Sequence, residues 1–237
     1  GVNVISRSEG VLLCSENIAT ESDPGKIRWE TLPDGDVGLR PPDGGGPIAE
    51  EQSVTPLSDG TLYCVYRTVA GHVACCASAD DGHSWTAPEW LRYPDGRLVK
   101  NPRAANFIWP LSKGRYLYWF HNHGEKSYAH RAVVWCLGAT EVEGPGGRTL
   151  AFSEPEVFLY KEAIHPGISY PDMLELPSGD LLVTETEKSV ARLHHVPADF
   201  IERIFEPRPP LPADRVLAGQ GAGEYPAPVL PVIFDHK

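Results

Sequence analysis

The chain of 237 residues lacks the surplus of basic residues that a general nucleic-acid binder needs. It has 21 Lys and Arg residues against 32 Asp and Glu residues, a formal net charge of −11 at pH 7. Binding to polyphosphates or to an acidic membrane surface relies on a basic face that displaces counterions. The composition therefore predicts no nucleic-acid partner. The sequence also has no apolar run of about 18 residues, so we expect no membrane span.

Cysteine motifs are scarce as well. The five cysteines are an odd number without regular spacing, and none of them forms a Cys-x-x-Cys pair. This pattern predicts neither a disulfide framework nor a zinc site, and we expect all five to be small buried apolar side chains. The HExxH and EF-hand motifs are also missing, so we expect no metal and no cofactor.

Helical periodicity is almost absent, and turns and short strands take its place. The chain contains 23 Gly and 23 Pro without a collagen-like period, which indicates many turns and favours an all-β fold. One short helix is expected over 197–205, and the proline-rich segment 206–231 is expected to be a linker or strap. The expected strands, rich in β-branched, aromatic and Leu residues, are 2–7, 11–15, 61–67, 73–77, 116–121, 133–137, 181–185, 190–194 and, at the end, 229–234.

These strands repeat together with their turns. Residues 56–63 (Pro-Leu-Ser-Asp-Gly-Thr-Leu-Tyr) align with 110–117 (Pro-Leu-Ser-Lys-Gly-Arg-Tyr-Leu), and 176–182 form a looser third copy. In each copy a glycine provides the positive φ of a hairpin turn, and an apolar strand follows. Strand-only units of roughly 40–65 residues are typical of propeller blades. The sequence predicts one domain with units 10–47, 48–100, 101–165 and 166–206, followed by a strap over 207–237.

Residues 78–85 fit the pattern Ser-x-Asp-x-Gly-x-(Ser/Thr)-Trp. Asp80 can accept hydrogen bonds from turn amides, Gly82 can adopt the unusual φ, and Trp85 can bury its ring. The segment resembles the Asp-box, or BNR repeat, of the sialidase (neuraminidase) superfamily, and the chain is similar over about 48–205 to bacterial sialidase-like proteins. The resemblance implies a β-propeller of four-stranded antiparallel blades and a structural role for Asp80 on its rim.

The same resemblance bears on the number of blades. Sialidases have six, whereas four units are visible in this sequence. We expect either five blades, closed by 2–7 pairing with 229–234, or an incomplete six-bladed ring from a truncated chain.

Polar residues just past the inner strands of a propeller are natural candidates for a ligand site. The resemblance to sialidases implies an arginine cluster for a substrate carboxylate, a Tyr nucleophile with a Glu base, and an Asp acid/base. Carried onto this chain, Tyr170 would be the nucleophile, Glu185 its base and Asp172 the acid/base. The further catalytic candidates are His121 and His123, and the substrate-binding candidates are Arg67, Arg103, Arg131, Arg192, His72 and Asn122. The Arg-Ile-Pro start of ordinary sialidases is missing here.

Three functions therefore follow from the sequence. The first is an exo-glycosidase that hydrolyses a terminal anionic or related sugar from a glycan or polysaccharide. The second is a lyase for a uronate-containing polysaccharide, with Arg103 and Arg192 as cations and His121, His123 and Tyr170 as base and acid. The third is a non-catalytic glycan-binding propeller with Trp109, Trp119 and Trp135 as stacking platforms. An extracellular glycan would imply a secreted or periplasmic protein; the sequence leaves the oligomeric state open.

Purely structural roles are the alternatives to these assignments. Arg67 can instead pair with Glu50 or Glu51 across the sheet, and His121 or His123 can be hydrogen-bonded interior residues. Asn122 would point away from both histidines if all three continued a strand, which favours a structural role for it.

Overall fold

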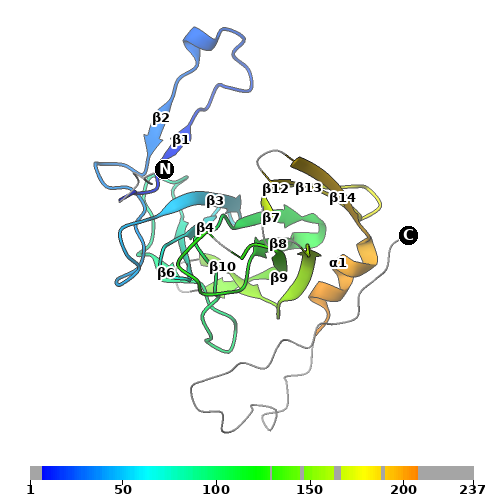
Figure 1. The fold of residues 1–237 in the computed structure, drawn as a ribbon. Helices are drawn as coiled ribbons and strands as arrows, with labels where there is room; N and C mark the ends of the chain where they lie inside the picture. The colour runs from blue at the N-terminus through cyan, green and yellow to red at the C-terminus, as the bar shows by residue number, and fades with distance from the viewer. Residues whose placement is uncertain (1–6, 129, 145–146, 163–166, 188–189, 208–237) are drawn as a thin grey trace. The chain divides into compact units, whose positions relative to one another are not determined.

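The computed structural model describes residues 7–128, 130–144, 147–162, 167–187 and 190–207 (Figure 1). The chain divides into two units, 1–206 and 207–237, and the elements described below belong to the first. The expected strap over 207–237, the final strand 229–234 and most of the expected strand 2–7 lie outside the described residues. None of the helices in the described ranges is long and apolar enough to cross a membrane.

The first sheet has two antiparallel strands, β1 (Leu12–Cys14) and β2 (Glu30–Leu32), with the 3-10 turn η1 (Pro24–Lys26) between them. The strand expected over 11–15 is therefore present, and it pairs with β2. Gly10, two residues before β1, exchanges backbone hydrogen bonds with Leu39. Val11, Leu13 and Trp29 are exposed, as befits a two-stranded sheet with no core of its own.

The second sheet is four-stranded and antiparallel throughout. Its order is β3 (Glu50–Pro56), β4 (Leu62–Arg67), β5 (Val73–Ser78) and β6 (Glu89–Trp90). Side chains from both faces of β4 are buried, because it is a central strand with packed layers on each side. The strands expected over 61–67 and 73–77 are confirmed.

The third sheet has five strands. Its main order is β10 (Gly147–Phe152), β9 (Val133–Gly144), β8 (Arg115–Phe120) and β7 (Phe107–Leu111), and β11 (Glu156–Tyr160) also pairs with β9. The 3-10 turn η2 (Ser112–Gly114) joins β7 to β8. Strand β9 runs well beyond the expected 133–137, because its first half pairs with β11 and its second half with β10.

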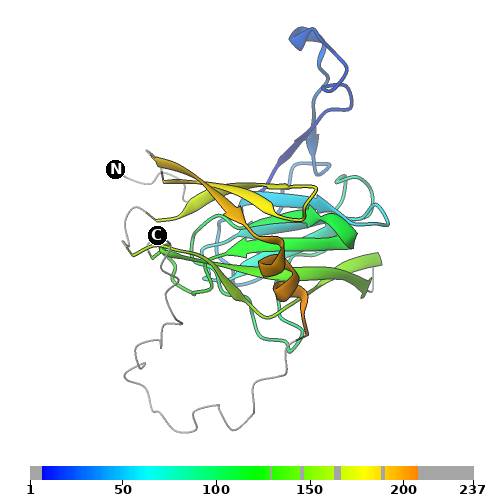
Figure 2. The same cartoon turned by 90° about the vertical axis from the view of Figure 1, so that its right-hand side faces the viewer.

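The fourth sheet has three strands in the described part of the chain, in the order β12 (Ser169–Glu175), β13 (Leu181–Glu187) and β14 (Val190–Val196). The helix α1 (Ala198–Phe205) follows, where a short helix was expected. It buries Ile201 and Ile204 in an apolar cluster that also contains Trp119 of β8 and Val183 of β13. Figure 2 shows α1 beside the third and fourth sheets.

The three larger sheets pack in sequence order. One apolar cluster joins the second and third sheets through residues such as Val65 and Phe120, and another joins the third and fourth through Leu117 and Leu181. The protein is thus mostly antiparallel strands with few helices, as the all-β prediction requires. The described sheets do not close into a ring, so the blade count and the unit boundaries stay predictions.

Two glutamates bind the repeated Pro-Leu-Ser turns. Ser58 donates its backbone N–H (2.8 Å) and its hydroxyl to the two oxygens of Glu141 on β9. Ser112 donates in the same way to Glu175 on β12, at 2.6 and 2.7 Å. Each contact, here called a serine–glutamate latch, joins a turn of one sheet to a strand of the next. In these two copies of the repeat, the serine is the residue that makes the contact between sheets.

The turn Ser78–Trp85 is built as its residues predict. Asp80 accepts hydrogen bonds from the Ser84 N–H (2.9 Å), the Ser84 hydroxyl (2.6 Å) and the Ser78 hydroxyl (2.8 Å). These bonds, led by the Ser84 hydroxyl, lower the pKa of Asp80 to about 2. Gly82 has a φ of 95°, and the Trp85 indole N–H donates to its carbonyl.

All five cysteines are free thiols. Cys64, Cys75, Cys76 and Cys136 are buried, as expected. Cys14 is partly exposed because it lies in the two-stranded sheet, which contradicts the prediction that all five are buried.

Candidate functional site

Two consecutive carboxylates at the start of β3 form the base of the candidate site. A register shift lies between Glu50 and Ser53, and Glu51 has a φ of 56°. Such a bulge breaks the alternation of side chains along a strand. Both glutamates can therefore reach Arg67 at the end of β4: its Nε donates to Glu50 Oε2 at 2.8 Å, and its Nη1 lies 2.8 Å from Glu51 Oε2.

Arg103 is the second cation on Glu50. Its Nη2 lies 3.1 Å from Glu50 Oε1. The side chains of Glu50, Arg67 and Arg103 are only 10–12 % exposed. Buried charges of this kind are stable only while their partners are present, so the three residues act as one unit. The structural alternative for Arg67, an ion pair with Glu50 or Glu51, is thus confirmed.

Tyr170, which is far from Glu51 in the sequence, also contacts this cluster. It lies at a register shift between Ser169 and Asp172 at the start of β12, and its φ is 46°. Its hydroxyl donates to Glu51 Oε1 at 3.2 Å. Two bulges, on strands of different sheets, therefore bring a phenol and a carboxylate together. Non-glycine residues at positive φ are strained, and such strain is common at functional sites.

The environment shifts the pKa values of both groups upward. Burial raises the pKa of Glu51, and the positive charge of Arg67 offsets part of this effect. Burial and the adjacent charge of Glu51 raise the pKa of Tyr170. The positive charge of Arg131 acts on both groups and lowers both pKa values. A carboxylate with a raised pKa is a better proton acceptor for a phenol that does not ionise by itself near neutral pH.

The segment between β8 and β9 covers the two paired arginines. The ring centre of Tyr128 lies 4.8 Å from the guanidinium carbon of Arg103 and 5.8 Å from that of Arg67. The backbone N–H of Arg103 donates to the Ser127 carbonyl at 3.2 Å. Tyr128 was not a candidate in the sequence, because no strand or turn motif surrounds it.

The histidines of this segment are placed differently from the prediction. Strand β8 ends at Phe120, so His121 and His123 do not share one face of a strand. His121 is buried with Nδ1 3.0 Å from the Val133 carbonyl, and burial lowers its pKa to about 3. His123 Nε2 lies 3.0 Å from the His130 carbonyl, and burial lowers the pKa of His123 as well. Asn122, between them, has a φ of 52°.

The expected pair of Tyr170 and Glu185 is not formed, because the bulge turns the Tyr170 hydroxyl to Glu51. In the ladder, Glu185 of β13 lies opposite the bulge that contains Tyr170. Glu185 as a whole is only 1 % exposed. Its carboxylate lies 2.8 Å from Arg192 Nη1 and 3.6 Å from His194 Nε2. Glu185 and Arg192 thus form a separate ion pair.

The two remaining candidates have local contacts. Asp172 accepts a hydrogen bond from the Met173 N–H at 2.8 Å. His72 lies with Nδ1 3.4 Å from the Val99 carbonyl and packs edge-on against the ring of Trp90. The structure therefore brings together Arg67, Arg103 and Tyr170 from the sequence candidates and adds Glu50, Glu51 and Tyr128. Arg131 acts on this cluster through its charge.

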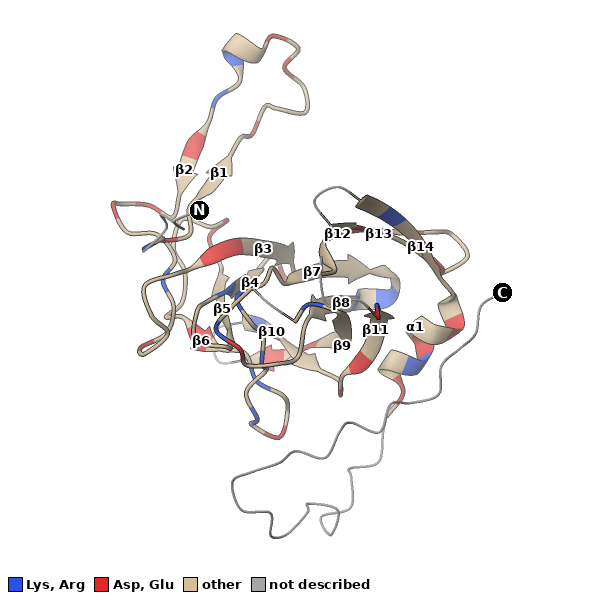
Figure 3. Ribbon diagram, in the orientation of Figure 1, with Lys and Arg blue, Asp and Glu red and all other residues tan. Residues whose placement is uncertain are grey.

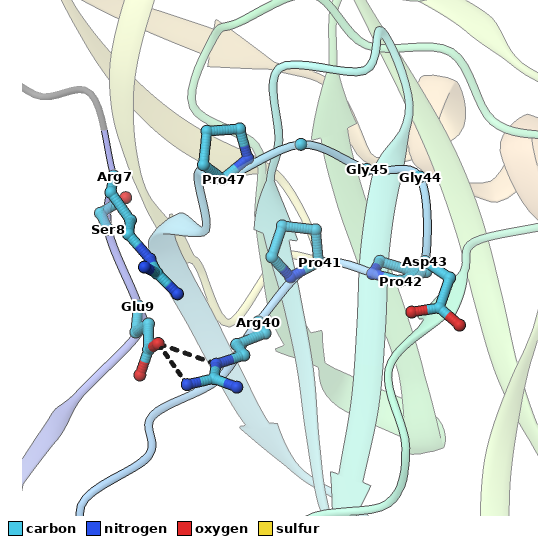
Figure 4. Close-up of a pocket in the computed structure, with 11 residues that line it drawn as sticks. Arg7, Ser8, Glu9, Arg40, Pro41, Pro42, Asp43, Gly44, Gly45 and Pro47 are labelled. Carbon is cyan, nitrogen blue, oxygen red and sulfur yellow. Dashed lines mark hydrogen bonds and ion pairs between the residues drawn. The ribbon is translucent and has the colours of Figure 1, made fainter.

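A pocket of about 690 Å³ lies elsewhere in the chain and is shown in Figure 4. It is lined by residues 7–9 and 40–47, with the Glu9–Arg40 ion pair on one wall. It shares no residue with the Tyr170 cluster.

Within the described ranges, no group of three or more His, Cys, Asp and Glu side chains is arranged to hold a metal ion. Figure 3 marks the positions of the acidic and basic residues along the ribbon.

Neither a known family model nor a curated protein matches the sequence. Solved structures do match the fold. One is the intramolecular trans-sialidase from Ruminococcus gnavus in complex with oseltamivir carboxylate, with a TM-score of 0.52 and 16 % identity over 72 % of this chain and 36 % of that chain. Another is the leech intramolecular trans-sialidase complexed with 2,7-anhydro-Neu5Ac, with a TM-score of 0.52 and 15 % identity over 73 % of this chain and 26 % of that chain. The fold is sialidase-like, and the chain spans about a third or less of these proteins.

Proposed function

We propose that the protein is a carbohydrate-active enzyme, a sialidase-like exo-glycosidase that hydrolyses a terminal anionic or related sugar. The observation that carries the proposal is the 3.2 Å hydrogen bond from the Tyr170 hydroxyl to Glu51, beside the guanidinium of Arg67. A phenol bound to a carboxylate of raised pKa is an activated nucleophile. The sialidase-like fold adds support for glycans as the substrate class.

The proposed reaction has two steps. Glu51 accepts the phenolic proton while the Tyr170 oxygen attacks the anomeric carbon, and the leaving oxygen takes a proton from an acid, for which Asp172 is the candidate. In the second step, water attacks the anomeric carbon and the bond from this carbon to the Tyr170 oxygen breaks. The residue that served as acid now takes a proton from the water, and Tyr170 recovers its proton from Glu51. Two displacements retain the anomeric configuration. Glu51 therefore replaces Glu185 as the proposed base.

The charges of the cluster favour an anionic sugar. Arg67, Arg103 and Arg131 contribute three positive charges, and Glu50 and Glu51 contribute two negative charges. The five side chains together carry one net positive charge, which favours an anionic group over a neutral or cationic one.

The hydrogen-bonded turn Ser78–Trp85 gives further support to this family assignment. Its Asp80 and Gly82 have the contacts and the φ that the Asp-box pattern requires. We interpret the turn as a structural Asp-box, because Asp80 binds only its own turn among the contacts described above.

The two alternatives have less support. Both histidines of the lyase reading are hydrogen-bonded to backbone: His121 is buried with Nδ1 3.0 Å from the Val133 carbonyl, and His123 Nε2 lies 3.0 Å from the His130 carbonyl. A non-catalytic binder would need exposed indoles, whereas Trp119 is buried and Trp109 and Trp135 pack against the apolar clusters.

The test is turnover of fluorogenic glycosides of sialic acid and glucuronic acid, with neutral glucosides for comparison. We expect Tyr170→Phe and Glu51→Gln to reduce kcat by at least about 10³-fold for the acidic substrate. Tyr160→Phe is the matched control, because Tyr160 is an exposed tyrosine on β11. Mass spectrometry of quenched reactions should find the glycosyl group on Tyr170.

Three outcomes would contradict the proposal. Full turnover by Tyr170→Phe would rule out the nucleophile. An unsaturated product that absorbs in the ultraviolet would indicate a lyase. Saturable binding of all substrates without any product would indicate a glycan-binding module.

A further inference from the structure

The pocket of about 690 Å³ in Figure 4 has no part in the proposed chemistry. It lies between the segment 7–9 and the loop 40–47. The segment precedes β1 and the loop follows β2, so the pocket lies at the base of the hairpin 10–39, which contains both strands. A cavity of this volume is large enough for a small organic molecule.

Hydrogen bonds fix the segment and the loop before any ligand binds. The Ser8 N–H donates to the Pro47 carbonyl at 3.0 Å, and the Ala49 N–H donates to the Ser8 carbonyl at 3.1 Å. On the other side of the loop, the Tyr66 hydroxyl of β4 donates to the Arg40 carbonyl at 2.7 Å. The loop is therefore bonded both to the segment and to the second sheet. A preformed site of this kind costs little ordering entropy on binding.

The loop is also stiff and closely packed. Three prolines of the lining, Pro41, Pro42 and Pro47, have a fixed φ and present apolar rings. Gly45 is buried, and a Cβ at this position would lie 2.6 Å from Pro41 Cβ and 2.9 Å from the ring of Trp90. Only glycine fits there, which keeps the loop against the second sheet.

Two guanidiniums belong to the lining. Glu9 Oε1 lies 2.7 Å from both Nε and Nη2 of Arg40, and Nη1 has no such contact within the described ranges. Arg7 is exposed, and its side chain has no hydrogen bond or ion pair with the other residues that the structure describes. The Gly38 N–H and Arg40 lower the pKa of Glu9, and the positive charge of Arg7 adds to this effect.

The charges at this end of the pocket favour a monoanion. Arg7, Arg40 and Glu9 together carry one net positive charge, although the whole chain carries −11. In Figure 4 the side chain of Asp43 lies at the far end of the loop from the Glu9–Arg40 pair. A dianion would bring its second charge close to Glu9, whereas a carboxylate matches the planar fork of a guanidinium. The proline rings suit an apolar ring on the same molecule.

We propose that this pocket is a binding site for a small organic monocarboxylate with an apolar ring, held by Arg7 and by the free Nη1 of Arg40. A carboxylate bound there joins the chain before β1 to the chain after β2 and closes the base of the hairpin. The inference does not rest on the proposed function, because the pocket shares no residue with the Tyr170 cluster.

The test is a titration of the full chain with benzoate, followed by amide NMR. Benzyl alcohol is the neutral counterpart, and phenyl phosphate at pH 7.5 is the dianionic one. We expect benzoate to shift the amide signals of Gly44 and Gly46, which line the pocket. The signals of Gly60 and Gly96, two turn glycines outside the lining, should stay in place.

Variants of Arg7 separate charge from geometry. Arg7→Gln should raise Kd for benzoate by at least about tenfold, equivalent to about 1.4 kcal/mol. Arg7→Lys retains the charge but not the fork, and it should raise Kd by about threefold. Arg28→Gln is the matched control, because Arg28 is an exposed arginine outside the pocket and its replacement changes the net charge equally. This control should leave Kd within about twofold.

Hydrogen exchange tests the closure of the hairpin base. Gly10 and Leu39 exchange two backbone hydrogen bonds of 2.8 Å at this base. If opening of this pair releases the ligand, benzoate at ten times Kd should slow exchange of both amides about tenfold. The amides of β13, which is not part of the pocket, should exchange at an unchanged rate. Equal slowing at Gly10 and in β13 would contradict the closure.

Four other results would overturn the site. These are shifts confined to the surroundings of Arg67 and Tyr170, equal binding of benzyl alcohol, tighter binding of phenyl phosphate than of benzoate, and equal losses in Arg7→Gln and Arg28→Gln. Tyr170→Phe should bind benzoate as the parent chain does. Failure of the hydrolase and failure of this binding site are therefore distinguishable.

Discussion

At the scale of single residues, Glu51 is the group whose ionisation should govern activity. A base must be deprotonated, and burial raises the pKa of Glu51 above the ordinary carboxyl value of about 4.3. We therefore expect kcat/KM to rise with pH through a pKa above that value. The pKa of Tyr170 is also raised, so the phenol stays protonated near neutral pH and its direct ionisation contributes no limb there.

Variants of Arg131 test the direction in which the acidic limb of this pH profile moves. Its positive charge lowers the pKa of Glu51, so Arg131→Gln should move the acidic limb of the pH profile to higher pH. Arg131→Lys retains the charge and should leave the limb near its original position. A limb that moves to lower pH in Arg131→Gln, or that moves equally in both variants, would contradict Glu51 as the titrating base.

Residue types at this site were easier to predict than their pairing. Arg67, Arg103 and Tyr170 could be named from strand ends and from the resemblance to sialidases. Glu51 could be named only as a structural partner of Arg67, because regular strand alternation places consecutive residues on opposite faces. The bulge at Glu51, which overturns that rule, contains no glycine or proline, whereas the bulge at Tyr170 contains Pro171, a signal that the sequence analysis did not use.

At the scale of elements, the serine–glutamate latches should make measurable contributions to stability. Glu141 binds the Ser58 N–H and hydroxyl and accepts the Tyr116 hydroxyl at 2.6 Å. Its removal takes a charged acceptor from the exposed Ser58 donors and from the part-buried Tyr116 hydroxyl, and a hydrogen bond to a charged group contributes about 1.5–3 kcal/mol. We expect Glu141→Ala to lower the free energy of unfolding by about 2–4 kcal/mol, measured by urea denaturation.

Glu143→Ala is the matched control for this measurement. Glu143 lies two residues further along β9, is largely exposed, and contacts only Arg148 at 3.5 Å among the ion pairs of the described residues. Such a pair contributes about 0–1 kcal/mol. Similar losses in Glu141→Ala and Glu143→Ala would show that the latch has no special role.

Elements were predictable where local pattern decides them. The strands over 62–67, 115–120 and 181–187 and the helix over 198–205 follow from short apolar runs between turns. The partner of β1 and the length of β9 depend on residues far away in the sequence. Long-range pairing of this kind leaves no local signal, so the strand over 30–32 was not expected.

At the scale of the whole molecule, the distribution of thiols provides a test of the packing. Four of the five cysteines are buried, and burial raises the pKa of Cys75 to about 12. A water-soluble aromatic disulfide reagent should react promptly with one thiol, Cys14, in the native protein. All five should react in denaturant. Prompt reaction of two or more thiols in the native protein would contradict this packing. Prompt reaction of a thiol in the native Cys14→Ser variant would contradict it as well.

The whole architecture could be predicted only in outline. Repeats of turn and strand correctly indicated antiparallel sheets, and the fold is sialidase-like. Whether sheets close into a ring depends on packing between elements at the two ends of the sequence. No periodicity within a single unit can encode that closure, and the number of blades therefore stays a prediction.

The two latches also have a consequence for cooperativity. Each joins one sheet only to the sheet that follows it, Ser58 to Glu141 and Ser112 to Glu175. In the third copy of the turn, the Ser178 hydroxyl instead accepts the Asp180 N–H of its own hairpin. Energetic coupling of this form is nearest-neighbour, as in linear repeat proteins. A local opening of one sheet would then weaken the sheets beside it directly and more distant sheets only through them.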